Sequence, residues 1–183
     1  MRPPRALYPS RAKFMAAQLV TIEKASPETL EEVLEILYQV DLPHDGVKEH
    51  FDGFLVARSG GGMILGCVGL ERHGNLGLLR SAAVLPEYQG QWIGNKLIRE
   101  ILKRAASEGV TEVVLLTTTA KEYFQKKFGF KEARRTRYEK RLVNSPEWNL
   151  PRCSSAVFMT LKLIPNADPI TQGGTGNETT RRE

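Results

Sequence analysis

The chain alternates between strand-like and helix-like runs of apolar residues. Residues 18–24 have the pattern of a strand. Ser26 followed by Pro27 is typical of a helix start, because serine caps the first turn and proline fits within it. Apolar residues then recur at helical spacing until Pro43 ends the run. They are Leu30, Val33, Leu34, Leu37 and Tyr38. A second, short helix is predicted over residues 47–51.

The middle of the chain has the pattern of an antiparallel meander. Residues 54–58 and 63–70 are predicted strands, and the serine and glycines between them, residues 59–62, have the turn chemistry of a β-hairpin. Another turn at residues 73–75 leads into residues 76–84, which we predict to be the third strand.

The second half contains two predicted helices and two predicted strands. Residues 94–107 place aliphatic residues on one face and charged residues mostly on the other, as an amphipathic helix does, and Gly109 suits its C-cap. A short buried strand at 112–117, a short helix at 121–128 and a final strand at 155–163 follow. The pattern therefore predicts an α+β fold around a mixed sheet.

Length and charge limit the class of protein. With 183 residues and 41% hydrophobic content, the chain has room for one substantial core and one domain. No apolar run reaches the roughly 18 residues that a membrane-spanning helix needs, so we expect a soluble protein without a membrane partner. Of the net charge of +5, residues 1–14 carry +4 and residues 165–183 carry −1, which leaves +2 for the body. Because +2 is typical of an ordinary solvated surface, no nucleic-acid partner is expected.

The two ends of the chain are predicted to lie outside the folded domain, residues 15–164. Residues 1–14 are basic, contain prolines and lack the apolar stretch of a secretory signal, so we interpret them as a flexible N-terminal extension. A transit-type peptide is the alternative, and Met15 as the true start leaves open whether residues 1–14 are native. Residues 165–183 have almost no apolar content and are predicted to be a disordered tail. We expect a cytoplasmic protein.

Cysteine and histidine spacing does not indicate a metal or a disulfide. Cys67 and Cys153 lie far apart in apolar segments, without a CxxC pair, and the three histidines are scattered. We therefore expect no metal. Cys153 is interpreted as a packed thiol rather than a nucleophile, because no histidine stands in a recognisable relation to it.

The segment from Val84 to Asn95 carries the clearest chemical signal. It joins a predicted strand to a predicted helix and contains Gly90 and Gly94. Small residues at such a junction allow backbone N–H groups to approach a phosphate, and the positive end of the helix dipole favours the negative charge. These residues alone favour a phosphate-containing ligand, with a tight turn that binds nothing as the alternative.

This segment resembles the acetyl-CoA signature of the GNAT acetyltransferase family, Q/R-x-x-G-x-G/A, through Val84-x-Pro86-x-x-Gln89-Gly90-Gln91-x-Ile93-Gly94. Residues 115–120 and a short helix that ends at Phe128-Gly129-Phe130 are similar to the family's next strand and helix. The resemblance covers residues 16–163. Four segments are most similar to amino-acid N-acetyltransferases of the arsenic-resistance and N-acetylglutamate-synthase-like types. They are residues 67–71, 79–81, 117–120 and 154–157.

The resemblance implies a GNAT fold, with a mixed, mostly antiparallel sheet of about six to seven strands, splayed at the acetyl-CoA site and flanked by about four helices. It implies an N-acetyltransferase that moves the acetyl group of acetyl-CoA to the primary amine of a small amino acid or an analogue. Direct attack by the amine needs no covalent enzyme intermediate. The implied cofactor-binding residues are Ala83, Val84, Gln89, Gly90, Gln91, Trp92, Ile93, Gly94, Asn95 and Phe124.

One residue departs from the family signature. Trp92 occupies the position of the first glycine of the closing pair, where glycine permits close backbone approach and an unusual φ. Tryptophan is expected to supply neither. Three interpretations remain open: a cloning change, since Gly and Trp codons can differ by one base; a side chain that points outward harmlessly; and an enzyme that binds CoA poorly.

The candidate catalytic residues are Glu71 and Tyr123. Many members of the family have a tyrosine four residues before the glycine of the G-F pair, where it protonates the departing thiolate, but here that position is Gln125. Tyr123, two residues earlier, is the candidate general acid, and the alternative is that it packs with Phe124 under the CoA arm. Glu71, at the end of a strand, is the candidate base for the ammonium proton.

The candidate substrate residues are Arg80, Ser81 and Thr118. Arg80 is expected to pair with the carboxylate of an amino-acid substrate, and the alternative is an ion pair with a structural acid. Ser81 and Thr118 are expected to line the acceptor cleft.

Other function classes stay open. A GNAT-fold binding or regulatory module without turnover is motivated by Trp92 and the missing tyrosine. Protein N-acetylation needs an open groove for a peptide, whereas the polar residues 131–151 are expected to cover the cleft. A homodimer is also left open.

Overall fold

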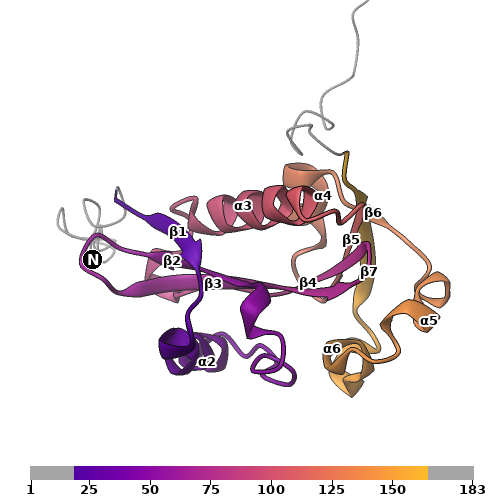
Figure 1. The fold of residues 1–183 in the computed structure, drawn as a ribbon, viewed down its shortest axis with the longest axis horizontal. Helices are drawn as coiled ribbons and strands as arrows, with labels where there is room; N and C mark the ends of the chain where they lie inside the picture. The colour runs from indigo at the N-terminus through magenta and orange to yellow at the C-terminus, as the bar shows by residue number, and fades with distance from the viewer. Residues whose placement is uncertain (1–18, 165–183) are drawn as a thin grey trace, which may run out of the picture.

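The computed structural model describes residues 19–164, which form one seven-stranded sheet with helices on both faces (Figure 1). The strand order is β1-β2-β3-β4-β5-β7-β6. Neighbouring strands are antiparallel except β4 and β5, which are parallel. The mixed, mostly antiparallel sheet is therefore confirmed. The strands are β1 (Thr21–Lys24), β2 (Phe54–Arg58), β3 (Ile64–His73), β4 (Leu76–Val84), β5 (Glu112–Thr117), β6 (Lys131–Glu132) and β7 (Val157–Lys162).

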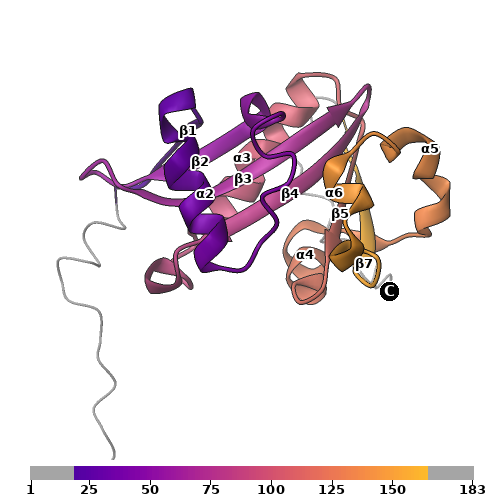
Figure 2. The ribbon, with the colours of Figure 1, turned by 90° about the horizontal axis from the view of Figure 1, so that it is seen from below.

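The helices cover the two faces of the sheet unequally. In Figure 1, α3 and α4 lie on one side of the sheet, and α2 and α6 lie on the other. Figure 2 shows α2 across the indigo-to-purple half of the sheet, and α5 and α6 near β5 and β7 at its other end. Both faces of the central strands are therefore covered, which explains why β2 and most of β3 and β4 are buried. The helices are α2 (Leu30–Gln39), α3 (Ile93–Ser107), α4 (Lys121–Phe128), α5 (Glu139–Leu142) and α6 (Pro146–Asn149).

Some predicted elements differ from the structure. The helix predicted over residues 47–51 is wrong, because these residues form turns that lead into a 3₁₀ helix at Phe51–Gly53. Val47 and Phe51 nevertheless both pack into the core beneath α2, and a turn brings them there without a helix. The first strand begins at Thr21 rather than residue 18. The predicted N-terminal extension and C-terminal tail lie outside the described residues.

The sheet opens between β4 and β5. These strands pair only from Leu76–Leu79 and Glu112–Leu115, whereas β5 stays paired with β7 as far as Thr117. The register between β3 and β4 shifts at a β-bulge, where Ser81 has a φ of +53°. Because a bulge bends its strand and increases the local twist, β4 diverges from β5 beyond Leu79. The predicted splay therefore has a local cause in β4.

The Cys67 side chain contacts the bulge. Its thiol donates a hydrogen bond to the Ser81 carbonyl at 3.4 Å and is fully buried. The carbonyl of a bulged residue loses its regular ladder partner, so this thiol supplies a replacement. Cys67 is thus a structural residue of the open part of the sheet.

Residues 131–151, which have a polar sequence, are held against β7 by specific side-chain contacts. Tyr138 and Trp148 pack on Phe158 of β7, with ring centroids 4.8 Å and 5.5 Å away. Arg135 lies over the Trp148 ring, 4.1 Å from its centroid, and donates to the Cys153 carbonyl at 2.8 Å. These contacts hold α6 beside the opening between β4 and β5.

Candidate active site

A cavity of about 660 Å³ lies along the end of β4, between α3 and α4. Nine of the predicted cofactor-binding residues line it: Ala83, Val84, Gln89, Gly90, Trp92, Ile93, Gly94, Asn95 and Phe124. The tenth, Gln91, is not in the cavity wall, and its amide donates to the Glu87 carbonyl at 3.3 Å. Most residues of the motif therefore line one cavity, which we call the cofactor cavity.

The N-terminal turn of α3 faces this cavity. The first intrahelical bond at this end runs from the Lys96 N–H to the Trp92 carbonyl at 3.0 Å, so the N–H groups before it have no partner within the helix. Asn95 is 9% exposed and its Nδ2 is buried without a hydrogen-bond partner, while its Oδ1 accepts from Arg99 at 2.6 Å. A buried, unsatisfied donor is costly, by about 1–3 kcal/mol. The N-terminal turn of α3 therefore presents backbone donors to an acceptor-rich ligand such as a phosphate, and Asn95 has an unsatisfied donor in the same cavity wall.

Trp92 adopts the backbone conformation of the glycine that it replaces. Its φ is +66°, next to Gly90 at +76°, so the expectation that tryptophan would not supply an unusual φ is wrong. The indole is 65% exposed and lies under the Lys127 ammonium, 5.3 Å from the ring centroid. The side chain thus projects outward over the cavity rim. Of the three interpretations, the outward-pointing side chain agrees with this geometry.

A second cavity of about 350 Å³ adjoins the first where β4 and β5 diverge. Four residues line both cavities: Ala82, Thr119, Ala120 and Phe124. The predicted substrate residues Arg80, Ser81 and Thr118 all line the second cavity, which we call the acceptor cavity. Two ligands, one in each cavity, would meet at the divergence of the two strands.

Four acceptor groups surround the Arg80 guanidinium. Its guanidinium bonds the Glu71 carboxylate through Nη1, and its Nη2 lies 3.0 Å from Glu147 Oε2. Its Nη2 also donates to the Asp45 carbonyl at 2.5 Å, and its Nε donates to Ser81 Oγ at 3.3 Å. The Arg80 side chain is fully buried. Of the two interpretations of Arg80, this geometry matches the ion pair with structural acids.

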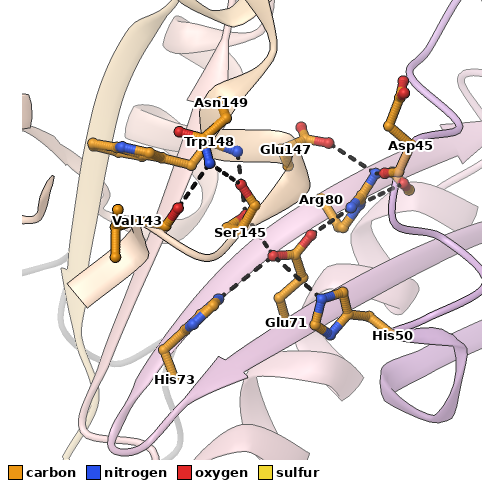
Figure 3. Close-up of polar contacts among 11 residues, drawn as sticks. Asp45, His50, Glu71, His73, Arg80, Val143, Ser145, Glu147, Trp148 and Asn149 are labelled. Atoms are coloured by element: carbon orange, nitrogen blue, oxygen red, sulfur yellow. Dashed lines mark hydrogen bonds and ion pairs between the residues drawn. The ribbon is translucent and has the colours of Figure 1, made fainter. Parts of the chain in front are cut away.

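Glu71 lies at the centre of a polar cluster rather than in a cavity wall. Ser145 Oγ donates to its Oε2 at 2.6 Å, and His73 lies 3.5 Å from the same oxygen, as Figure 3 shows. Burial acts to raise the pKa of Glu71, but the hydrogen bonds from His73 and Ser145 and the charge of Arg80 outweigh it, and the pKa is lowered. Among the described residues, Glu71 lines neither cavity and has no exposed side-chain surface. Its role as a base stays a prediction that its position does not favour.

Tyr123 lines the cofactor cavity but not the acceptor cavity. A Cβ added to Gly94 would lie 3.7 Å from its hydroxyl, so the hydroxyl is beside the first turn of α3. Its ring packs edge-on against Phe124 and Phe128, with both centroids 5.5 Å away. Burial raises its pKa. The packing role and the general-acid role are both compatible with this position, and the latter stays a prediction.

Two carboxylates in the acceptor cavity were missed by sequence reasoning. Glu147, in the first turn of α6, and Asp41, just after α2, both line the cavity. In the sequence, Glu147 follows Ser145 and Pro146, and an acid in that position is typical of a helix start. No local signal places it beside Arg80, because that contact joins residues far apart in the chain.

Within residues 19–164 there is no group of three or more histidine, cysteine or acidic side chains arranged to hold a metal ion. No helix in the same range is long and apolar enough to cross a membrane.

Part of the chain is similar to a known domain family. The acetyltransferase (GNAT) domain family matches residues 50–132. An uncharacterized N-acetyltransferase from Chlorobaculum tepidum is 34% identical over 89 residues, which are 48% of this chain and 56% of that protein. This chain therefore matches little more than half the length of that relative.

Solved structures share the fold at low sequence identity. N-acetylglutamate synthase from Neisseria gonorrhoeae, complexed with coenzyme A and L-arginine, superposes with a TM-score of 0.64 and 21% identity, over 79% of this chain and 33% of that chain. An acetyltransferase of the GNAT family from Staphylococcus aureus superposes with a TM-score of 0.65 and 18% identity, over 79% of this chain and 99% of that chain. Residues 50–132 are therefore similar to the GNAT acetyltransferase domain, and residues 19–164 have the fold of these solved acetyltransferases.

Proposed function

We propose that this chain transfers the acetyl group of acetyl-CoA to the primary amine of a small molecule. The observation that carries this proposal is the pair of adjoining cavities, one lined by the GNAT signature and the other by β4, β5 and α6. Donor and acceptor in separate cavities with a shared wall are in position for direct transfer, and such positioning supplies much of the rate of a two-substrate reaction. The family match to residues 50–132 supports the same chemistry.

The cofactor cavity suits acetyl-CoA. Bound there, acetyl-CoA supplies an activated thioester, and the N-terminal turn of α3 would hold its pyrophosphate. The buried Nδ2 of Asn95 lacks a partner in the described residues and would donate to the same group. Ala83 and Val84, at the end of β4, would offer backbone groups to the pantetheine arm, because β5 does not pair with this part of β4.

The transfer needs no covalent intermediate on the protein. The amine nitrogen forms a bond to the acetyl carbon, the carbon–sulfur bond breaks, and the proton lost by the amine must leave the acceptor cavity. Among the described side chains that line this cavity, Glu147 and Asp41 carry the carboxylates, and they are candidates to take that proton. The position of Glu71 behind Arg80 makes it a positioning residue in this proposal.

A small acceptor fits better than a peptide. The acceptor cavity is about 350 Å³, and Glu147, Cys153 and Ala156 close one side of it. The small amino acid predicted from the sequence has the right size. The N-acetylglutamate synthase named above is similar in fold only, so the kind of small amine must be decided from the cavity itself.

Calorimetric titration of acetyl-CoA into the full chain tests this proposal, together with release of free CoA in the presence of amines. Asn95→Leu is the matched variant, because it removes the orphaned donor at nearly constant volume. We expect Asn95→Leu to weaken acetyl-CoA binding by about tenfold. The free energy of unfolding should change little, because relief of the unsatisfied donor is offset by loss of the hydrogen bond from Arg99. If the native chain does not bind acetyl-CoA, the proposed function is wrong.

A further inference from the structure

Trp92 and Lys127 form a small exposed patch on the rim of the cofactor cavity. Both side chains line that cavity, and neither lines the acceptor cavity. The Lys127 ammonium lies 5.3 Å from the centroid of the indole, which is 65% exposed, so the ring has surface left for a second partner. Within residues 19–164, no acidic side chain forms an ion pair with this ammonium. The patch therefore offers an aromatic face and a positive charge side by side.

The position of this patch along the cavity decides which part of CoA it would meet. The wall shared with the acceptor cavity must hold the thioester, because the acetyl group has to reach the amine. Val84, at the end of β4, would face the pantetheine arm, and the N-terminal turn of α3 would hold the pyrophosphate. Trp92 is the residue immediately before that turn. Beyond the pyrophosphate, only the nucleotide of CoA, an adenosine with a 3′-phosphate, remains to be placed.

We propose that Trp92 and Lys127 bind the nucleotide end of CoA, the indole by stacking on the adenine and the ammonium by pairing with the 3′-phosphate. This inference rests on the proposed acetyl transfer and assigns two binding residues that the signature does not contain. Aromatic side chains bind bases through stacking, and a lysine ammonium is a compact charge that suits a phosphate. A glycine at position 92, as in the signature, has no side chain with which to stack.

The backbone of Trp92 is compatible with both contacts of the loop. Its φ of +66° is strained for a residue other than glycine, and such strain is often found where a loop clamps a ligand. The positive φ keeps the loop in a glycine-like conformation while the indole projects over the rim. The backbone N–H groups of the α3 turn therefore stay available to the pyrophosphate, and the side chain is free to contact the nucleotide.

Two ligands that differ in the nucleotide test the stacking. We would titrate acetyl-CoA and acetyl-4′-phosphopantetheine, which keeps the thioester and one phosphate, into the full chain and its variants. Trp92→Asn removes the ring and tolerates a positive φ, whereas Trp92→Phe keeps an aromatic ring. We expect Trp92→Asn to raise the Kd of acetyl-CoA about fivefold and to leave that of acetyl-4′-phosphopantetheine unchanged. Trp92→Phe should bind acetyl-CoA nearly as tightly as the native chain.

Tryptophan fluorescence gives a second readout that does not depend on turnover. The chain has two tryptophans, and the other one, Trp148, is only 5% exposed. Stacking of a purine on an indole quenches its emission, so acetyl-CoA should quench the native signal with the Kd found by calorimetry. Acetyl-4′-phosphopantetheine should not quench it. In Trp92→Phe, where Trp148 is the remaining tryptophan, the quenching should be lost although acetyl-CoA still binds.

3′-Dephospho-CoA isolates the contribution of Lys127. The native chain should bind CoA about threefold more tightly than 3′-dephospho-CoA, because an exposed ion pair contributes little. Lys127→Gln should remove this difference. The matched control is Lys126→Gln, which removes the same charge from the next residue of α4. Lys126 pairs with Glu122 at 2.7 Å and lines neither cavity, so its variant should keep the difference.

The outcomes separate this inference from the proposed function. Equal or tighter binding of acetyl-CoA by Trp92→Asn, or binding without quenching in the native chain, overturns the stacking and leaves the proposed function standing. An equal loss of affinity for both ligands in Trp92→Asn also overturns it, because the loop conformation would then set the affinity. A preference for CoA over 3′-dephospho-CoA that persists in Lys127→Gln overturns the assignment of Lys127. Failure of the native chain to bind acetyl-CoA overturns the proposed function and the inference together.

Discussion

At the scale of single residues, Trp92 is the departure that most affects the cofactor site. A non-glycine residue in the left-handed region costs roughly 1–2 kcal/mol, and an exposed indole adds apolar surface. The cation–π contact between the Lys127 ammonium and the indole offsets about 0.5–1 kcal/mol of this cost, as is typical of an exposed site. The loop is therefore held in its glycine-like conformation against the preference of tryptophan.

Replacement by glycine tests whether Trp92 impairs the loop. In Trp92→Gly, relief of the left-handed strain is opposed by loss of the Lys127 contact and by the greater freedom of glycine in the unfolded chain. We expect the free energy of unfolding to stay within about 1 kcal/mol of the native value, measured by chemical denaturation. We expect acetyl-CoA affinity within about tenfold of the native chain, because the backbone already has the required φ.

The matched variant is Trp92→Val, whose β-branched side chain tolerates a positive φ poorly. It should be less stable than both other forms by about 1–2 kcal/mol and should bind acetyl-CoA more weakly. A gain well above tenfold on changing tryptophan to glycine would instead show that this chain binds CoA poorly.

At the scale of elements, the sequence predicted the regions with regular periodicity. Alternation of apolar and polar residues predicts the strands of the meander, and amphipathic spacing predicts the long helix α3. Glycines predict the turn before α3, so each of these elements carries its own local signal. The segment from residue 131 to residue 151 does not. Its helices α5 and α6 have four residues each and are fixed by Tyr138, Leu142 and Trp148 packing on β7, which is a tertiary effect.

The site also divides into a part with a local sequence signal and a part that depends on tertiary contacts. The cofactor loop is one contiguous segment, so its motif was visible in the sequence. The partners of Arg80 come from β3, from the loop after α2 and from α6, and no local pattern brings them together. The set of side chains around Arg80 therefore appears only in three dimensions.

Ser145 links α6 to the sheet, and its removal tests the role of this element. Its Oγ accepts from the Trp148 N–H at 3.2 Å as the N-cap of α6 and donates to Glu71 at 2.6 Å. In Ser145→Ala both bonds are lost, so we expect the free energy of unfolding to fall by about 1–3 kcal/mol. Because α6 carries Glu147 into the acceptor cavity, KM for the amine should rise while acetyl-CoA affinity stays unchanged.

Ser145→Thr keeps the hydroxyl and should retain most of the stability and most of the amine affinity, provided that the extra methyl group is accommodated. Denaturation curves and calorimetry on the three forms give both quantities. An equal loss of acetyl-CoA affinity in Ser145→Ala would argue against separate anchoring of the two cavities.

At the scale of the whole molecule, two buried or half-buried acid clusters tie distant parts of the chain together. Glu71 joins β3 to β4 and α6, and Glu112 joins β5 to β7 and to the segment before α5 through Tyr138 at 2.8 Å. Burial acts to raise the pKa of Glu112, but hydrogen bonds from Tyr138, Thr160 and Lys162 lower it overall. The contacts of both carboxylates depend on the ionised form, so the fold as a whole depends on pH.

This dependence predicts acid destabilisation with a defined sign. A carboxylate whose folded-state pKa is depressed stabilises the fold above its unfolded pKa, about 4.3 for glutamate, and that contribution is lost as pH falls through the folded value. The free energy of unfolding should therefore be nearly constant from pH 7 to about 5 and decrease steeply below about 4.5. Glu71→Gln should be less stable at pH 7 by about 1–3 kcal/mol, because a charge-assisted hydrogen bond to Arg80 is lost while Glu147 still opposes the guanidinium. It should also show a shallower loss below pH 4.5, whereas the exposed-site control Glu139→Gln should follow the native curve. Urea denaturation at each pH measures these slopes, and a Glu71→Gln curve parallel to the native one would show that Glu71 does not carry the acid sensitivity.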